Sequence, residues 1–138
     1  MKKVFVSICI ASTVLAMFSC RSVEKAIPLS SINGEWNIIE VNGSKVTPGE
    51  SRNLPFITFD TATGRLSGNS GCNRMMGSFD VNAKPGSIDF KGIAGTKMMC
   101  PDMTTERNVL GALAQVKGYK KAGKDKMYLC NDSNRPVV

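Results

Sequence analysis

Turn-forming pairs between short apolar runs constrain the fold of this chain more than any other feature. Asn42-Gly43 follows the apolar run 35–41, and this pair is a strong hairpin signal because both central positions of a type I′ turn require positive φ. Pro85-Gly86 separates the runs 77–82 and 87–93, as a turn would. Short runs joined by such turns are typical of antiparallel strands, so the chain is predicted to be mainly β.

Further strands and a single helix follow from the remaining pattern. The other predicted strands are residues 44–47, 54–59, 65–67, 126–130 and 136–138. Val109, Leu110, Leu113 and Val116 recur instead at helical spacing, which predicts one α-helix at about 104–116. Asp102 can cap its start and Gly118 ends it. The expected fold is a small antiparallel β-barrel-like meander, with the helix packed over an edge or an end.

The N-terminal residues have the composition of an export signal. Lys2 and Lys3 precede an uncharged apolar run, residues 4–18, so residues 1–19 are predicted to be a signal peptide. The following Ser19-Cys20 resembles the lipobox of bacterial lipoproteins, which predicts lipidation of Cys20; the alternative is an ordinary signal peptide with an incidental cysteine. Residues 20–31 are then the lipidated cysteine and its tether, and 32–138 the domain. We expect an exported lipoprotein anchored by its N-terminal lipid at the outer membrane, facing the periplasm.

The charge of the exported part is basic but not extreme. Without Lys2 and Lys3, sixteen basic residues stand against eleven acidic ones, a net charge of +5. Five lysines lie close together in the sequence: Lys117, Lys120, Lys121, Lys124 and Lys126. They could meet anionic headgroups or an acidic partner, or form a solvated edge that blunts strand pairing, which is the preferred interpretation. Nucleic acid is not an expected partner, because export separates the chain from it.

The chain contains no histidine, which restricts its chemistry. Neither a Ser-His nor a Cys-His dyad can form, and histidine-ligated zinc is excluded. Asp60, Asp80 and Asp89 could in principle support glycosidase-type chemistry, but they occupy strand ends and alternating strand positions where solvated acids are ordinary. We therefore predict no catalytic residues, no cofactor and no enzymatic activity.

Three cysteines remain once Cys9 and Cys20 are set aside with the leader and the anchor. They are Cys72, Cys100 and Cys130, and three pairings can be drawn among them. An oxidising envelope favours a bridge in a small domain. Closing the 29 residues from Cys72 to Cys100 would remove about 3.6 kcal/mol of chain entropy. This pair is the favoured disulfide, with Cys130 as a buried thiol.

Methionines gather around the same two cysteines. They are Met75, Met76, Met98, Met99 and Met103. Thiolate and thioether groups together suit Cu(I), so Cys72, Met98, Met99 and Cys100 form an alternative metal set. The preferred interpretation is that the methionines fill an irregular core where loops meet, and no metal site is predicted.

Several segments together resemble the META/HslJ-like domain family. They are I-N-G-E-W at 32–36, L-S-G-N-S-G-C-N-R at 66–74 and T-K-M-M-C-P at 96–101, with a helix after the last. The resemblance covers about residue 29 to the C-terminus. It implies a β-barrel-like domain with one helix and an envelope or stress-associated protein, with links to heat induction and antibiotic tolerance in some members and to secretion or motility in others. It supplies no reaction. The family's usual last strand is slightly longer than residues 136–138.

Two functions are compatible with these observations. The first is a non-enzymatic envelope lipoprotein, associated with stress or antibiotic tolerance, that binds another envelope component through a loop containing Asn69, Ser70, Asn73 and Arg74. The second is a small-ligand carrier, for an apolar molecule in the barrel or for Cu(I). An interior filled by Trp36, Ile38, Phe56, Phe59, Phe79 and Phe90 would leave no ligand room, whereas an open cavity of several hundred cubic ångströms would favour the carrier.

Overall fold

The computed structural model describes residues 26–48 and 54–138. The predicted signal peptide, residues 1–19, and the predicted lipidation site, Cys20, lie outside these residues. Within them, no helix has the length and apolar character needed to cross a membrane.

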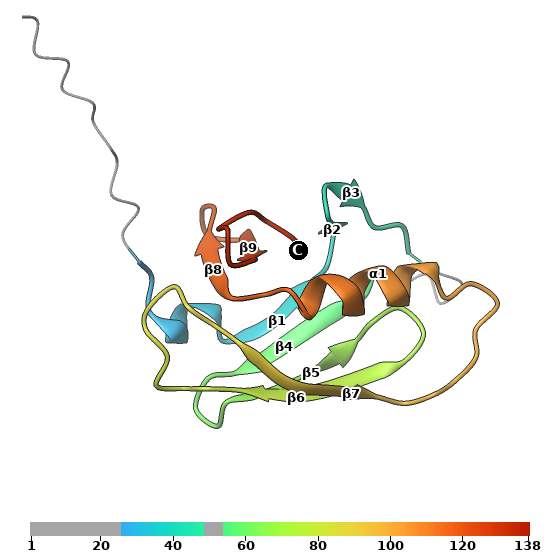
Figure 1. The fold of residues 1–138 in the computed structure, drawn as a ribbon, viewed down its shortest axis with the longest axis horizontal. Coiled ribbons are helices and arrows are strands. Elements are labelled where there is room, and N and C mark those ends of the chain that lie inside the picture. The colour runs from blue at the N-terminus through green and yellow to red at the C-terminus, as the bar shows by residue number, and fades with distance from the viewer. Residues whose placement is uncertain (1–25, 49–53) are drawn as a thin grey trace, which may run out of the picture.

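A five-stranded antiparallel sheet forms the base of the domain (Figure 1). Its strands, in spatial order, are β1 (Gly34–Asn37), β4 (Phe56–Asp60), β5 (Arg65–Asn69), β6 (Arg74–Phe79) and β7 (Phe90–Gly95). Alternate side chains point to one face, where Ile57, Phe59 and Leu66 are buried, as the period of two in a strand requires. The helix and the smaller hairpins lie over that face in Figure 1. The predicted mainly β meander with one helix is therefore confirmed.

Two short hairpins extend the sheet into a barrel-like arrangement. They are β2 (Glu40–Val41) with β3 (Ser44–Lys45), and β8 (Gly118–Lys121) with β9 (Met127–Cys130). The Asn42-Gly43 turn has positive φ at both residues, 49° and 79°, as predicted. The described strands form separate sheets, which backbone hydrogen bonds join at Ile88 N to Lys117 O (3.1 Å) and at Asn42 N to Val137 O (3.0 Å).

The C-terminal residues pair with β9, since Val137 N donates to Leu129 O (2.8 Å) and Leu129 N to Val138 O (2.8 Å). The predicted last strand, residues 136–138, is not a strand of its own: it makes only an isolated bridge, Cys130 to Pro136, beside these hydrogen bonds.

The helix α1 (Thr104–Leu113) begins where predicted and ends earlier. Asp102 Oδ1 accepts a hydrogen bond from Thr104 N at 2.7 Å. The hydrogen bonds donated by Gln115 and Val116 are of the tighter i to i−3 kind, such as Val116 N to Leu113 O at 3.2 Å, so the last turn is not α-helical. Val116 is still 1% exposed, which explains why its periodicity resembled that of a longer helix.

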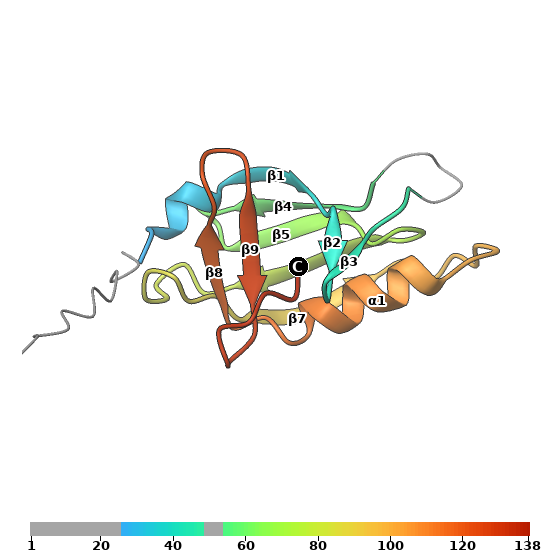
Figure 2. The same cartoon turned by 90° about the horizontal axis from the view of Figure 1, so that it is seen from above.

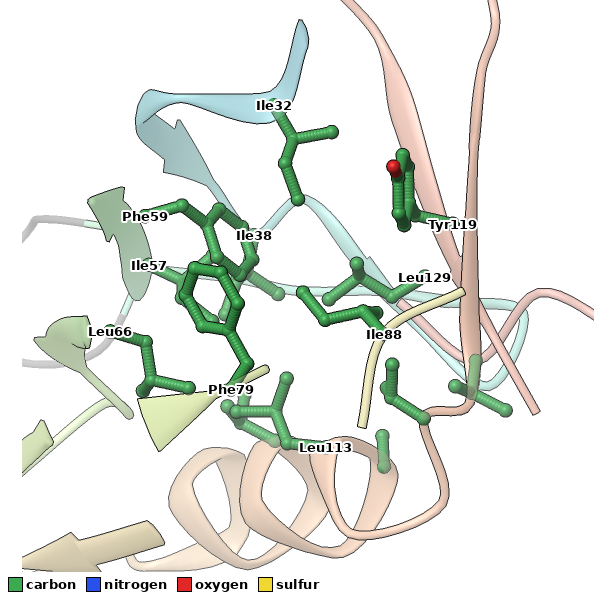
Figure 3. Packing of buried hydrophobic residues seen from close by; sticks show 14 of the residues in the cluster. Ile32, Ile38, Ile57, Phe59, Leu66, Phe79, Ile88, Leu113, Tyr119 and Leu129 are labelled. Carbon is green, nitrogen blue, oxygen red and sulfur yellow. The ribbon is translucent and has the colours of Figure 1, made fainter. Parts of the chain in front are cut away.

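A single hydrophobic core lies between the sheet and the covering elements (Figure 3). The Phe59 ring meets Phe79 edge-on at 5.8 Å and stacks with Phe90 at 6.0 Å between centroids. Three of the predicted interior residues are fully buried: Ile38, Phe59 and Phe79. Trp36 and Phe90 are half-buried against this core. Phe56 was wrongly assigned to the interior; it alternates with buried Ile57 along β4 and therefore lies on the other face of the sheet.

Several boundaries differ from the sequence prediction. The predicted strand 35–41 is divided into β1 and β2, β6 lies three residues earlier than the predicted 77–82, and β7 begins three residues later than the predicted 87–93. Residues 118–121 form β8, which was not predicted. Glycine is needed at its first position, because a Cβ on residue 118 would lie 2.8 Å from Gly86 O. The expected tether also extends too far into the domain. Residues Leu29–Ile32 form a 3-10 helix, η1, and both Ile27 and Leu29 pack against the core, so the folded part begins before residue 32.

Candidate functional site: loops braced by a disulfide and a buried carboxylate

The loop between β5 and β6 is a tight turn that comes close to the start of α1. Ser70 N donates to Asn73 O at 2.9 Å, and Asn69 Oδ1 accepts from Gly71 N at 2.8 Å. Gly71 has φ +131°, and a Cβ there would lie 3.3 Å from Glu106 N. Glycine at 71 therefore permits both the backbone conformation and the close approach to the helix.

Gly68 is required for a different reason. Its φ is not positive, but a Cβ would overlap Phe56 O on the neighbouring strand. Gly77 has neither a positive φ nor a backbone clash, so Gly71 is the one of these three glycines with an unusual backbone angle.

Glu106, in the first turn of α1, holds this loop through four contacts. Its Oε2 lies within hydrogen-bond distance of Asn73 N (2.7 Å), Cys72 N (3.3 Å) and the Ser70 hydroxyl (3.1 Å). Its Oε1 accepts from Asn73 Nδ2 at 2.9 Å. The residue is only 7% exposed. Donors thus surround a buried carboxylate, which is the arrangement that compensates for its lost hydration.

These contacts also determine the ionisation of Glu106. Burial raises the pKa of its carboxyl, but the hydrogen bonds from Asn73, Ser70 and Cys72 outweigh that effect and hold the pKa below its ordinary value. The carboxylate form is therefore the one that the loop recognises.

Asn73 joins the turn to a third segment, the chain between β7 and α1. Its Oδ1 accepts from the Thr96 hydroxyl and from Met98 N, both at 2.7 Å, and its Nδ2 donates to Met98 O at 3.0 Å. The side chain is 2% exposed with its amide fully used. One asparagine therefore positions the β5–β6 turn, residues 96–98 and the helix start relative to one another.

The predicted disulfide ties the same segments covalently. Cys72 and Cys100 are bonded, with their Cα atoms 6.0 Å apart, so this pairing is confirmed among the three that could be drawn. Cys130 is a buried thiol in β9, as predicted. We call residues 69–74 and 96–103 the braced loops.

The four predicted loop residues have different environments within the braced loops. Ser70 is 1% exposed, and its side chain, like that of Asn73, bonds within the domain. Asn69 is half-buried and accepts from Gly71 N. Arg74 is exposed. The turn is therefore architectural, and among these four residues Arg74 presents its side chain to solvent.

The expectation that the methionines fill a core is met by Met75, which is 1% exposed, and in part by Met103, which is half-buried. Met76, Met98 and Met99 are exposed by 61%, 63% and 89%. The proposed Cu(I) ligands do not remain available as a set, because Cys72 and Cys100 form the disulfide and offer no thiolate. Among residues 26–48 and 54–138, no three Cys, Asp or Glu side chains group as a metal site.

The three aspartates considered for catalysis have local structural partners. Asp60 accepts from Ala62 N, Thr63 N and the Thr63 hydroxyl. Asp80 accepts from Asn82 N at 2.8 Å, and Asp89 forms an ion pair with Lys117 at 2.7 Å.

These features define a class: a small antiparallel β domain with one helix, in which a disulfide and a buried glutamate connect the helix start to a sheet turn. The META domain family matches residues 28–138. The chain belongs to the META domain family, as the resemblance of its motifs indicated.

Solved structures agree with this assignment, although no curated protein matched the chain. An NMR structure of a protein from Burkholderia xenovorans is similar with a TM-score of 0.56 and 25% identity, covering 76% of this chain and 79% of that one. A second NMR structure has a TM-score of 0.56 and 24% identity, covering 75% and 85%. These similarities support the fold and assign no activity to this chain.

Proposed function

We propose that this protein is a non-enzymatic, membrane-anchored envelope lipoprotein that binds another envelope component through the exposed part of its braced loops. The observation that carries the proposal is the exposure of Met98 and Met99 on a segment that is held in place. Met98 N and O both bond to Asn73, and Cys100 follows in the disulfide. Apolar side chains carried by a backbone that is already held in place form a contact surface whose backbone loses little entropy on binding.

Charged groups adjoin these methionines. Lys97 precedes Met98 and is exposed, as is Arg74 on β6, whose backbone bonds to Thr96 at 3.2 Å. A partner that offers an apolar patch with acidic neighbours would fit this surface. The binding-loop hypothesis therefore moves from the buried amide of Asn73 to Arg74 and the two methionines.

The carrier alternative gains no support from the described interior. The core is packed with side chains (Figure 3), and a pocket of about 70 Å³ lies beside Trp36, Ile57 and Val137. A larger hollow of about 680 Å³ is open, and Thr58, Ser67 and Met76 line it on the outer face of the sheet. Neither matches the enclosed apolar cavity that a ligand inside the barrel would need.

The remaining parts of the proposal rest on the sequence. The lipobox-like Ser19-Cys20 supports lipidation, and the family resemblance supports a role in stress or antibiotic tolerance at the outer membrane, facing the periplasm.

Site-specific photocrosslinking in cells tests the binding surface. A crosslinking residue at position 99 is expected to give a discrete adduct, and Met98→Ser or Arg74→Ala is expected to weaken it. Position 81 is the matched control, because Val81 is also apolar and exposed (40%) but follows the opposite end of β6 from Arg74. Identical adducts from positions 81 and 99, or adducts unaffected by both substitutions, would overturn the proposed site.

A further inference from the structure

The N-terminal segment joins the domain beside the lysine-rich hairpin. We call residues 117–126 the lysine hairpin, since they contain all five clustered lysines. The Tyr119 hydroxyl donates to Ile27 O at 3.0 Å. Ala26 and Ile27 line one hollow, of about 280 Å³, together with Lys120 and Lys121. Figure 2 shows the N-terminal segment and β8 at the same end of the molecule.

The distance from this point to the predicted anchor is short. Five residues, 21–25, lie between Cys20 and Ala26, and the six steps from one Cα atom to the next span at most about 20 Å when the chain is fully extended. An acyl chain on Cys20 would therefore hold Ala26, and the part of the lysine hairpin beside it, close to the membrane surface.

The charge of this region is positive after its acidic neighbours are counted. Asp89 forms an ion pair with Lys117, and Asp125 lies in the hairpin itself. Glu40 on β2 interacts electrostatically with Lys126. The five hairpin lysines and exposed Lys84, set against these three acids, give a net charge of +3. The ammonium groups of Lys121 and Lys126 lie over aromatic rings, of Trp36 at 5.6 Å and of Tyr128 at 4.9 Å, which orients them and preserves their charge.

We propose that the lysine hairpin is the membrane-facing surface of the anchored domain and that it binds anionic phospholipid headgroups. This inference rests on the proposed lipidation of Cys20. Lysines attract an anionic surface only within about one Debye length, roughly 8 Å at physiological salt. The tether, at most about 20 Å long, is short enough to let the hairpin come within that range. The braced loops, which precede α1 at the other end of the domain (Figure 1), then project away from the membrane towards a partner.

Amine labelling of the lipidated protein, residues 20–138, on vesicles tests this orientation. The protein is reconstituted into vesicles of phosphatidylcholine alone or mixed with phosphatidylglycerol, and mass spectrometry measures the labelling of each lysine by a water-soluble acylating reagent. We expect Lys120, Lys124 and Lys126 to label about fivefold more slowly on the anionic vesicles, with the difference removed by high salt. Lys97, in the braced loops, is the internal control and should label equally on both.

The possible failures can be told apart. Flotation with the neutral vesicles reports the anchor itself, so a protein that does not float overturns both the lipoprotein proposal and this inference. A protein that floats but whose hairpin lysines label equally on both vesicles overturns the orientation alone, and points instead to an acidic protein as the partner of the hairpin. Equal slowing of Lys97 and the hairpin lysines would also contradict it.

Discussion

The braced loops and the lysine hairpin are held by different kinds of interaction. In the braced loops, the side chains of Asn73 and Glu106 are buried and bonded across three segments, and a disulfide adds a covalent link. In the lysine hairpin, Lys117 forms an ion pair with Asp89, and each of the two side chains is about half exposed. Buried networks resist opening more than exposed charges do. The first region can therefore present a fixed shape, and the second a charge.

Removing the disulfide should have the largest effect. The double substitution Cys72→Ser/Cys100→Ser is expected to lower the free energy of unfolding by about 3.6 kcal/mol, because the unfolded chain regains the entropy of a 29-residue loop. Urea unfolding under oxidising conditions measures it. A loss below about 1 kcal/mol would mean that the bond does not constrain the unfolded chain as supposed.

Glu106→Ala should cost nearly as much, about 3 kcal/mol, because it leaves the backbone N–H groups of Cys72 and Asn73 buried without an acceptor. The same unfolding experiment measures it. Glu35→Ala is the matched control: Glu35 is exposed on β1, and its removal should change stability by less than about 0.5 kcal/mol. Equal effects of the two substitutions would contradict the claim that the buried Glu106 carboxylate stabilises the domain.

Acid should weaken the braced loops selectively. Since the pKa of Glu106 is lowered in the folded state, its contribution is fully present above the unfolded pKa near 4.5 and is lost as the pH falls through the folded pKa. The stability difference between the natural protein and Glu106→Gln should therefore shrink from pH 7 to pH 3. Asp60 and Asp102 also have lowered pKa values, but both are present in the two proteins, so their contributions cancel in the stability difference. A difference independent of pH would contradict the assignment.

The smallest effect is expected at the hairpin. Lys117→Ala breaks an ion pair whose side chains are 51% and 57% exposed, so the free energy of unfolding should fall by less than about 0.5 kcal/mol, and less still in high salt. Thermal unfolding at two salt concentrations measures it. A loss as large as that of Glu106→Ala would end the contrast between the two regions.

The strand pattern was largely predictable, because turn chemistry is local. Asn42-Gly43 specified its hairpin without reference to the rest of the chain. β8 was missed because its sequence, G-Y-K-K, offers only Tyr119 as a buried side chain, too little for a period-two signal. The end of α1 was misplaced because Val116 is buried by tertiary packing at a position that also fits helical spacing.

The site was predictable only in part. Counting the cysteines of a domain predicted to be exported favoured Cys72–Cys100, which the structure contains. The role of Glu106 was not predicted, because its hydrogen-bond donors lie 33 to 36 residues earlier and no local pattern joins them. The exposure of Met98 was missed because a hydrophobic side chain suggests burial. Here the segment is held instead by hydrogen bonds between the Asn73 side chain and the backbone of Met98.

Amide hydrogen exchange tests the central contrast most directly. The N–H groups of Cys72, Asn73 and Met98 each have a side-chain acceptor in the braced loops. They should exchange much more slowly than the amides of residues 123–125, which lie in the exposed turn of the lysine hairpin. Glu106→Ala should speed exchange at Cys72 and Asn73 and leave the hairpin turn unchanged. Exchange at Asn73 and Met98 as fast as in that turn would contradict the claim that the braced loops are a fixed surface.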